Sequence, residues 1–153
     1  MPTQSERTLI IVKPDGVQRA LTGEILARFE RRGLKVVALK LLHIARPLAE
    51  QHYAVHKGKP FYDGLIEYIT LGPVVLAVLE GPNAIELVRA TMGATRPVQA
   101  GPGTIRGDFG ADVSRNLIHG SDAPESAKSE IELYFKPTEL VSYDRGLDQW
   151  VAG

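Results

Sequence analysis

Three apolar runs of β-strand length, separated by segments with helical periodicity, constrain the fold of this chain more than any other feature. Leu9–Val12 and Val74–Leu79 are continuously apolar, which is typical of strands buried on both faces. The first run ends at Lys13-Pro14-Asp15-Gly16, a sequence that predicts a turn. Residues 34–44 are rich in Val and Leu and predict a longer strand between the two runs. Residues 116–119 predict a short last strand.

Amphipathic segments between and after these runs predict five helices. Apolar residues recur there at three- and four-residue intervals, with capping residues or proline at the expected starts. The predicted helices are one over residues 21–29 with Thr22 as candidate N-cap and Gly33 as its stop, one opened by Pro47, one over residues 61–69, one over residues 83–92 started by Asn83 with Glu86, and a closing one started by Asp122, Pro124 and Glu125.

The resulting order, β-α-β-α-α-β-α-loop-β-α, predicts the fold class. Two strand–helix–strand units in succession favour an α+β protein, a ferredoxin-like split βαβ sandwich with a four-stranded antiparallel sheet covered by helices. A small parallel doubly wound sheet is the alternative, because periodicity alone does not set strand direction. The chain has 153 residues and no internal repeat, so residues 1–153 are expected to form a single domain.

The charge balance narrows the classes of partner. Lys and Arg together number 18, Asp and Glu also number 18, and the formal net charge is therefore zero. Such a surface gives no electrostatic reason to expect a specific nucleic acid or an anionic membrane as partner. Any anion that the protein binds must be held by a local cluster of cations.

The absence of cysteine and of long apolar segments limits the cellular compartments in which the protein is expected. Without Cys, disulfides, thiolate metal sites and cysteine nucleophiles are excluded. Residues 1–7 contain no apolar stretch of the signal-peptide kind. The longest apolar run, Val74–Leu79, is much shorter than the roughly 20 residues that a membrane helix needs. We therefore expect a cytoplasmic protein.

Residues 93–110 are expected to form a functional loop without secondary structure of its own. Five Gly and two Pro fall within these 18 positions, and long loops in compact domains are usually functional. Their glycine spacing fits neither the dinucleotide fingerprint nor the Walker A loop. Arg106 on a flexible glycine backbone suits a phosphate clamp, because guanidinium can grip two oxygens at once. An exposed Arg in a turn is the simpler alternative.

His119 is the candidate nucleophile. It follows the predicted last strand and precedes Gly120-Ser121-Asp122 at a helix start. A free imidazole is about three quarters neutral at pH 7, and its nitrogen can accept a phosphoryl group when the other ring nitrogen is hydrogen-bonded. Glu130 lies on the apolar stripe of the closing helix, where a carboxylate needs a partner, and we expect it near His119. A core histidine bonded to a backbone carbonyl is the alternative.

His52 and His56 have the four-residue spacing of a metal pair on a helix. The Glu that follows the first His in zinc proteases is missing, and no third ligand is evident. An amphipathic helix with polar His side chains on its solvated face explains the pattern equally well. We therefore predict no metal-ligating residues, and loss of activity to a zinc chelator would favour the zinc alternative.

Three segments together resemble nucleoside diphosphate kinase. They are residues 12–19 (VKPDGVQR), residues 102–108 (PGTIRGD) and residues 115–122 (RNLIHGSD). The resemblance extends from about Glu6 to Trp150. It implies transfer of a γ-phosphoryl group from a nucleoside triphosphate to a nucleoside diphosphate by a ping-pong mechanism, through a phosphohistidine and with broad base specificity.

The resemblance also implies roles for individual residues. His119 would be phosphorylated on Nδ1, Glu130 and the nearby Ser121 would orient its ring, and Lys13 would complete the catalytic set. Cationic side chains would neutralise the phosphates, and aromatic stacking would accept any base. The implied nucleotide-binding residues are Lys13, Tyr53, His56, Phe61, Leu65, Arg89, Thr95, Arg106, Val113 and Asn116.

Cofactor and assembly are likewise implied by the resemblance. Mg²⁺ is expected to bridge the phosphates with few protein ligands. Self-assembly into a homohexamer is expected, with a tetramer as the alternative, because the chain extends past Phe135 into an apolar tail ending near Trp150.

Two rival functions remain. One is a nucleotide-binding relative of the same fold without turnover. The other is a nucleic-acid-binding module, and the zero net charge disfavours this second function.

Overall fold

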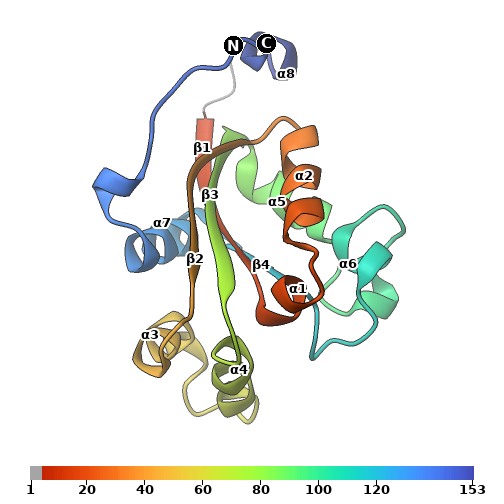
Figure 1. Ribbon diagram of the computed structural model, residues 1–153, viewed down its shortest axis with the longest axis vertical. Coiled ribbons are helices and arrows are strands. Elements are labelled where there is room, and N and C mark those ends of the chain that lie inside the picture. Colours follow the sequence, from red (N-terminus) through yellow and green to blue (C-terminus); the bar gives the residue numbers. More distant parts are fainter. Residues whose placement is uncertain (1–4) are drawn as a thin grey trace.

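The computed structural model describes residues 5–153 and contains a four-stranded sheet with the strand order β2-β3-β1-β4 (Figure 1). All neighbouring strands run antiparallel. This confirms the predicted α+β ferredoxin-like sandwich and excludes the parallel doubly wound alternative. The strands are β1 (Ser5–Val12), β2 (Lys35–Leu42), β3 (Val74–Pro82) and β4 (Ile118–Gly120).

Helices cover both faces of this sheet, as Figure 1 shows. Helices α2 and α5 lie on one face, whereas α7 and the hairpin formed by α3 and α4 pack against the other. The α-helices are α1 (Pro14–Gln18), α2 (Thr22–Arg31), α3 (Arg46–His52), α4 (Tyr62–Ile69), α5 (Ala84–Met92), α6 (Ile105–Phe109), α7 (Pro124–Tyr134) and α8 (Asp148–Val151), and single 3₁₀ turns occupy Ala54–His56, Pro97–Gln99 and Pro137–Glu139.

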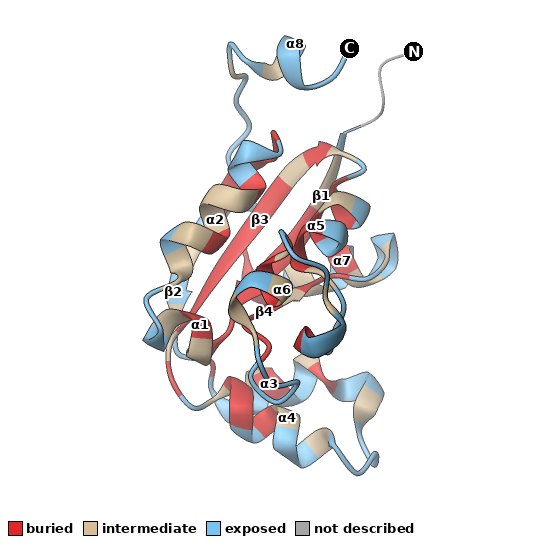
Figure 2. Cartoon of the chain, turned by 90° about the vertical axis from the view of Figure 1, so that its right-hand side faces the viewer, coloured by how far each residue is buried: buried red, intermediate tan, exposed pale blue. Residues whose placement is uncertain are grey.

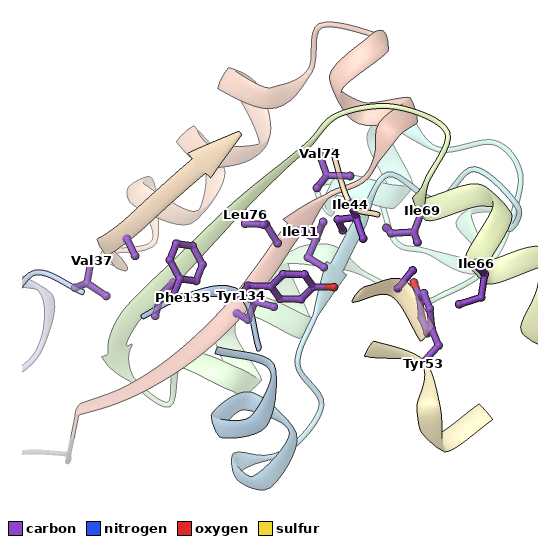
Figure 3. Packing of buried hydrophobic residues seen from close by; sticks show 14 residues of the cluster. Ile11, Val37, Ile44, Tyr53, Ile66, Ile69, Val74, Leu76, Tyr134 and Phe135 are labelled. Carbon is purple, nitrogen blue, oxygen red and sulfur yellow. The ribbon is translucent and has the colours of Figure 1, made fainter. Parts of the chain in front are cut away.

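Strands β1 and β3 are buried on both faces, as their continuous apolar runs predicted (Figure 2). Successive side chains of a strand point to opposite faces. Leu9 and Ile11 therefore join the core beneath α3, α4 and α7, where Figure 3 shows Ile11. Ile10 and Val12 join the core beneath α2 and α5. One short strand thus supplies side chains to two hydrophobic cores.

Strand β2 departs from this alternation at a β-bulge. The pairing with β3 shifts between Val36 and Ala38, so Val37 and Ala38 both face the same core. Beyond the bulge, Leu39 and Leu41 point away from that core and are 54% and 68% exposed. The edge strand of the sheet therefore carries an apolar strip that no other part of residues 5–153 covers.

Two predicted helix starts are wrong in their capping. Leu21, not Thr22, precedes α2. Asn83 precedes α5 with φ +52° but makes no capping hydrogen bond through its side chain. Instead, Glu6 of β1 accepts the amide hydrogen of Ile85 at 2.9 Å. A carboxylate from the neighbouring strand satisfies the helix N-terminus, which a local sequence pattern does not reveal.

The closing helix α7 begins near the predicted place but is capped differently. Pro124 is its first residue, as predicted. The Ser126 hydroxyl accepts the Ala123 amide hydrogen at 3.0 Å and donates to Asp122 Oδ1 at 2.5 Å. The N-cap is thus Ala123 rather than Asp122, and Ser126 rather than Glu125 binds its backbone amide.

The expectation of an unstructured loop over residues 93–110 is wrong. This segment contains the 3₁₀ turn Pro97–Gln99 and helix α6, whose N-cap Thr104 accepts the Gly107 amide hydrogen at 3.0 Å. Gly107 packs so closely that a Cβ there would lie 2.0 Å from the Gly101 carbonyl oxygen. Glycine here permits close backbone packing rather than flexibility. The predicted turn after β1 is likewise the short helix α1.

None of the helices within residues 5–153 has the length and apolar character that crossing a bilayer requires. The prediction that the beginning of the chain lacks an apolar leader falls partly on residues 1–4, which lie outside the described residues.

Candidate active site

A cavity of about 820 Å³ opens where the end of β1, the α3–α4 hairpin, α5, the segment 95–116 and β4 meet. Figure 1 shows the α3–α4 hairpin at the lower end of the molecule and α5 higher up. Nearly all the predicted site residues line it: Lys13, Tyr53, His56, Phe61, Leu65, Arg89, Thr95, Arg106, Val113, Asn116 and His119. Two predicted residues, Glu130 and Ser121, lie behind this lining.

His119 is held on β4 with one ring nitrogen fixed. His119 pairs with Ile11 of β1 in the sheet, and its Nε2 is hydrogen-bonded to Glu130 Oε1 of α7. The His119 side chain remains 23% exposed and lines the cavity. A histidine bound through Nε2 to a carboxylate retains Nδ1 for chemistry, because the carboxylate fixes the tautomer and the ring orientation.

The His52 ring packs against the His119 ring, a contact that was not predicted from the sequence. The two ring centroids lie 4.8 Å apart in an edge-to-face arrangement, and His52 Nδ1 is hydrogen-bonded to the Tyr134 hydroxyl at 2.9 Å. Figure 3 shows this hydroxyl pointing toward the end of α3. Burial, followed by repulsion from His119 and Lys13, lowers the pKa of His52 to about 3. His52 is therefore a neutral neighbour of His119.

The predicted helical pairing of His52 with His56 does not occur. Helix α3 ends at His52, and the chain continues into a 3₁₀ turn, so the two rings do not share a helical face. His56 lies against Phe61, with 5.2 Å between ring centroids. Metal-ligating atoms of His52, His119 and Glu130 lie within 4.8 Å of one another, and the hydrogen bond between His119 and Glu130 already accounts for that grouping.

Three cationic side chains, Lys13, Arg89 and Arg106, line the cavity close to His119. Lys13 is buried and donates from Nζ to Asn116 Oδ1 at 2.8 Å. Burial, reinforced by the charge of Arg106, lowers the Lys13 pKa to about 8. Burial and the nearby Arg89 lower the Arg106 pKa to about 10. Lys13 and Arg106 are buried and Arg89 is exposed. Like charges gathered in this way attract a polyanion, because the anion neutralises their mutual repulsion.

Arg106 is also a structural tie. Its guanidinium donates to the carbonyl oxygens of Asn116 at 3.0 Å, Gly93 at 3.1 Å and Ile118 at 2.6 Å. It thereby fastens the residues on either side of Leu117 to the start of the glycine-rich segment. The sequence prediction of a phosphate clamp did not anticipate this backbone role, since the three carbonyls converge only in the fold.

The opposite end of the cavity is formed by more exposed apolar residues. Phe61 and Val113 are 51% and 48% exposed, whereas Tyr53 is buried, and burial raises its pKa to about 12. Arg115 also lines the cavity and stacks on the Tyr68 ring at 4.8 Å. Neither Arg115 nor Tyr68 was predicted from the sequence to belong to the site. Helical spacing from Leu65, three residues earlier on α4, is the signal that places Tyr68 on the same face.

Ser121 has an unexpected environment. Its Oγ is buried and has no hydrogen-bond partner within residues 5–153. A bond from this hydroxyl to Glu130 is therefore not part of the structure. The orientation of the His119 ring depends on Glu130 and His52.

Comparisons with known proteins agree with this geometry. The family model described as nucleoside diphosphate kinase matches residues 6–140. The chain belongs to the nucleoside diphosphate kinase family. Nucleoside diphosphate kinases from Thermomicrobium roseum and Carboxydothermus hydrogenoformans are 60% and 62% identical to it, over 97% and 95% of this chain and 99% and 98% of theirs.

Solved structures of the family have the same fold. A halophilic nucleoside diphosphate kinase from Halobacterium salinarum in complex with CDP is similar with a TM-score of 0.94 and 51% identity, covering 97% of this chain and 99% of that one. A nucleoside diphosphate kinase family protein from Babesia bovis has a TM-score of 0.92 and 48% identity, covering 95% and 99%. The chain is thus an enzyme that transfers phosphoryl groups between nucleotides.

Nucleoside diphosphate kinases generally use a divalent cation, and the donor set of the cavity fits one mode of binding it. Glu67 is the sole carboxylate among the described residues that line the cavity. All-protein sites for hard divalent cations need several oxygen ligands, whereas a cation on a nucleotide is held mainly by phosphate oxygens and water. The lining therefore suits a cation that arrives with the phosphates.

Proposed function

We propose that His119 carries the phosphoryl group between the two nucleotides. Its Nδ1 lone pair forms a bond to the γ-phosphorus of a nucleoside triphosphate, while the bond from that phosphorus to the bridging oxygen breaks. The diphosphate leaves with the electron pair. In the return step, a β-phosphate oxygen of a second diphosphate attacks the phosphorus, and the N–P electrons return to the imidazole.

The observation that carries this proposal is the environment of the His119 ring. Nε2 is bound to Glu130, and the ring borders a cavity lined by Lys13, Arg89 and Arg106. Glu130 stabilises the positive charge that the ring acquires as its Nδ1 forms the new bond. The cations match the charge spread over the oxygens of the transferred group.

The remaining lining residues are assigned to substrate positioning. Thr95, Tyr53 and His56 join the three cations around the phosphates, and Lys13 with Asn116 faces the ribose hydroxyls. Phe61, Leu65 and Val113 border the base, and apolar contact there supports broad base specificity because every base offers a π-face. Ser121, two residues after His119, is assigned a supporting role beside Glu130.

We assign Mg²⁺ as the divalent cation. Bound to the phosphate oxygens, Mg²⁺ would neutralise charge and hold the triphosphate in a reactive conformation. No protein residue is assigned as its ligand. Lys13 and Arg106 approach the same phosphates from the protein side.

Phosphoenzyme trapping tests the proposal. The protein is incubated with γ-labelled ATP and Mg²⁺, quenched in base and assayed for protein-bound label that acid removes. The His119→Asn variant is expected to take no label, and EDTA is expected to prevent labelling of the wild type. His43→Asn is the control. His43 is exposed, is hydrogen-bonded to the Thr70 carbonyl and does not line the cavity, so this variant should take label normally. Labelling of the His119→Asn variant would contradict the role of His119. A wild type that takes no label would contradict the mechanism and favour a relative without turnover.

We also propose that the chain, acting as one domain over residues 1–153, assembles with copies of itself in the cytoplasm. The apolar strip of edge strand β2 and the exposed apolar residues of the C-terminal arm support self-association, because unpaired edges and apolar patches favour contact with another chain. A homohexamer is the expected state and a tetramer the alternative. Sedimentation at the mass of one chain would contradict it. The arm residues are Val141, Tyr143, Leu147 and Trp150.

A further inference from the structure

The backbone immediately before His119 adopts an unfavourable conformation. Leu117 is fully buried and has φ +74°, a region that side chains other than glycine rarely occupy. The Ile118 amide donates to the Asn116 carbonyl at 2.8 Å, which closes a γ-turn around Leu117. Such a conformation is strained and persists only where its surroundings enforce it.

Regular strand pairing does not provide that enforcement. The ladder between β1 and β4 joins Val12 to Ile118 and goes no further, so the Leu117 peptide lies beyond the sheet. A buried amide and carbonyl at such a point need other partners.

Both polar groups of Leu117 are held by the segment that follows β1. The Lys13 amide donates to the Leu117 carbonyl at 2.9 Å, and Asp15 Oδ2 accepts the Leu117 amide hydrogen at 3.1 Å. The second oxygen of the same carboxylate, Oδ1, accepts a hydrogen bond from the Tyr68 hydroxyl of α4. Asp15 thus joins the γ-turn to the hairpin that borders the cavity.

No other contact explains the Asp15 side chain within residues 5–153. It lies in the first turn of α1 but makes no capping hydrogen bond there, and it forms no ion pair with Lys or Arg at salt-bridge distance. Burial and the Asp15 hydrogen bond raise the pKa of Tyr68, so the phenol stays protonated and donates. The carboxylate is committed to two bonds that fix geometry.

We propose that Asp15 is a positioning residue for His119, which holds the Leu117 turn and thereby sets the direction in which β4 presents the imidazole. The inference rests on the proposed role of His119 as phosphoryl carrier. In-line transfer tolerates little displacement of the attacking nitrogen, and a shift of about 1 Å can cost roughly 100-fold in rate. Asp15 acts through the backbone and touches neither nucleotide nor the reacting atoms.

The test compares Asp15→Ala with Asp15→Asn by rapid-quench measurement of the rate at which ATP phosphorylates His119, together with the ATP dissociation constant. Asp15→Ala is expected to slow phosphorylation about 10- to 100-fold, with ATP affinity changed less than about threefold. Asp15→Asn keeps an amide oxygen that can accept the Leu117 amide hydrogen, and its rate is expected within about threefold of the wild type. Asp63→Ala, an exposed Asp in the first turn of α4, is the matched control and should be unchanged.

A second readout reports the turn directly. Hydrogen exchange of the Leu117 amide should remain slow in the wild type, in Asp15→Asn and in Tyr68→Phe, and become fast in Asp15→Ala. If Asp15→Ala does not fold, Asp15→Ser replaces it, because its side chain is too short to bridge Leu117 and Tyr68.

The outcomes separate the alternatives. An Asp15→Asn rate as low as that of Asp15→Ala would show that charge matters rather than position, and would overturn the proposal. A folded Asp15→Ala with wild-type phosphorylation rate would reduce Asp15 to a stabilising residue and overturn it as well. A wild type that takes no label would instead refute the role of His119 itself. The comparison among Asp15 variants does not test that role.

Discussion

The two ends of the cavity are built differently. At the histidine end, Lys13, Arg106 and Asn116 are buried, and each is hydrogen-bonded to another part of the chain. At the opposite end, Phe61 and Val113 are about half exposed apolar side chains, and Phe61 packs against the His56 ring. One end is fixed by directional bonds between distant segments, and the other offers a surface.

This difference corresponds to what each half of the reaction requires. Phosphoryl transfer depends on alignment and on charges placed in advance, so the histidine end must be fixed before a nucleotide arrives. Contact with a base requires area rather than a defined hydrogen-bond pattern, and an exposed apolar surface is sufficient. Substitutions at the two ends should therefore alter different quantities: rate and stability at the first, affinity at the second.

Loss of Arg106 should have the largest effect and would break the comparison if it did not. Arg106→Gln removes the guanidinium that donates to the carbonyl oxygens of Gly93, Asn116 and Ile118. We expect the free energy of unfolding to fall by about 3 kcal/mol or more and kcat/KM to fall roughly 100-fold or more. Urea denaturation and steady-state kinetics measure the two effects. Arg96→Gln, an exposed Arg of the same segment, should change neither.

The Lys13 ammonium predicts a pH dependence at the histidine end. Because its pKa is lowered to about 8, Lys13 loses its proton above pH 8 and the cavity loses one positive charge. We expect kcat/KM, which reports the free enzyme, to fall about tenfold per pH unit above that pH. The fall in kcat should occur at higher pH, since bound phosphates favour the charged form. A kcat/KM that stays level to alkaline pH would show that this charge is not needed.

Truncation of Phe61 should have the smallest effect and sharpen the contrast. In Phe61→Ala the base loses a stacking surface, which is worth about 1 kcal/mol at a half-exposed position, or about fivefold in KM. The kcat at saturation should be nearly unchanged, and diphosphates of different bases should be affected alike. Val55→Ala is the control, because Val55 lies on the same hairpin, is mostly exposed and does not line the cavity. A loss of kcat would show that this end also aligns the phosphates.

Much of the fold was predictable from the sequence because the responsible forces are local or periodic. The apolar runs of β1 and β3 indicated strands buried on both faces, and the two cores confirm it. The helical stripes located α2, α4, α5 and α7. Capping was less predictable. Glu6 of β1 accepts the amide hydrogen of Ile85 at the start of α5, and no pattern near Asn83 encodes that contact.

The candidate site was predictable in its members but not in its bonding. Resemblance and spacing pointed to His119, Glu130 and Arg106, which the fold brings together. His52 and Asp15 were missed as site residues, since each matters through a partner more than 60 residues away along the chain, His119 and Leu117 respectively.

By itself, the sequence determined which segments become strands and helices and which side chains are candidates for phosphotransfer, because hydrophobic periodicity and side-chain reactivity are properties of short stretches. The tertiary structure alone decided that Arg106 donates to three backbone carbonyls, that His52 packs against His119 and that Asp15 holds the Leu117 turn. Those contacts satisfy buried polar groups, and their partners are set only when distant segments pack together.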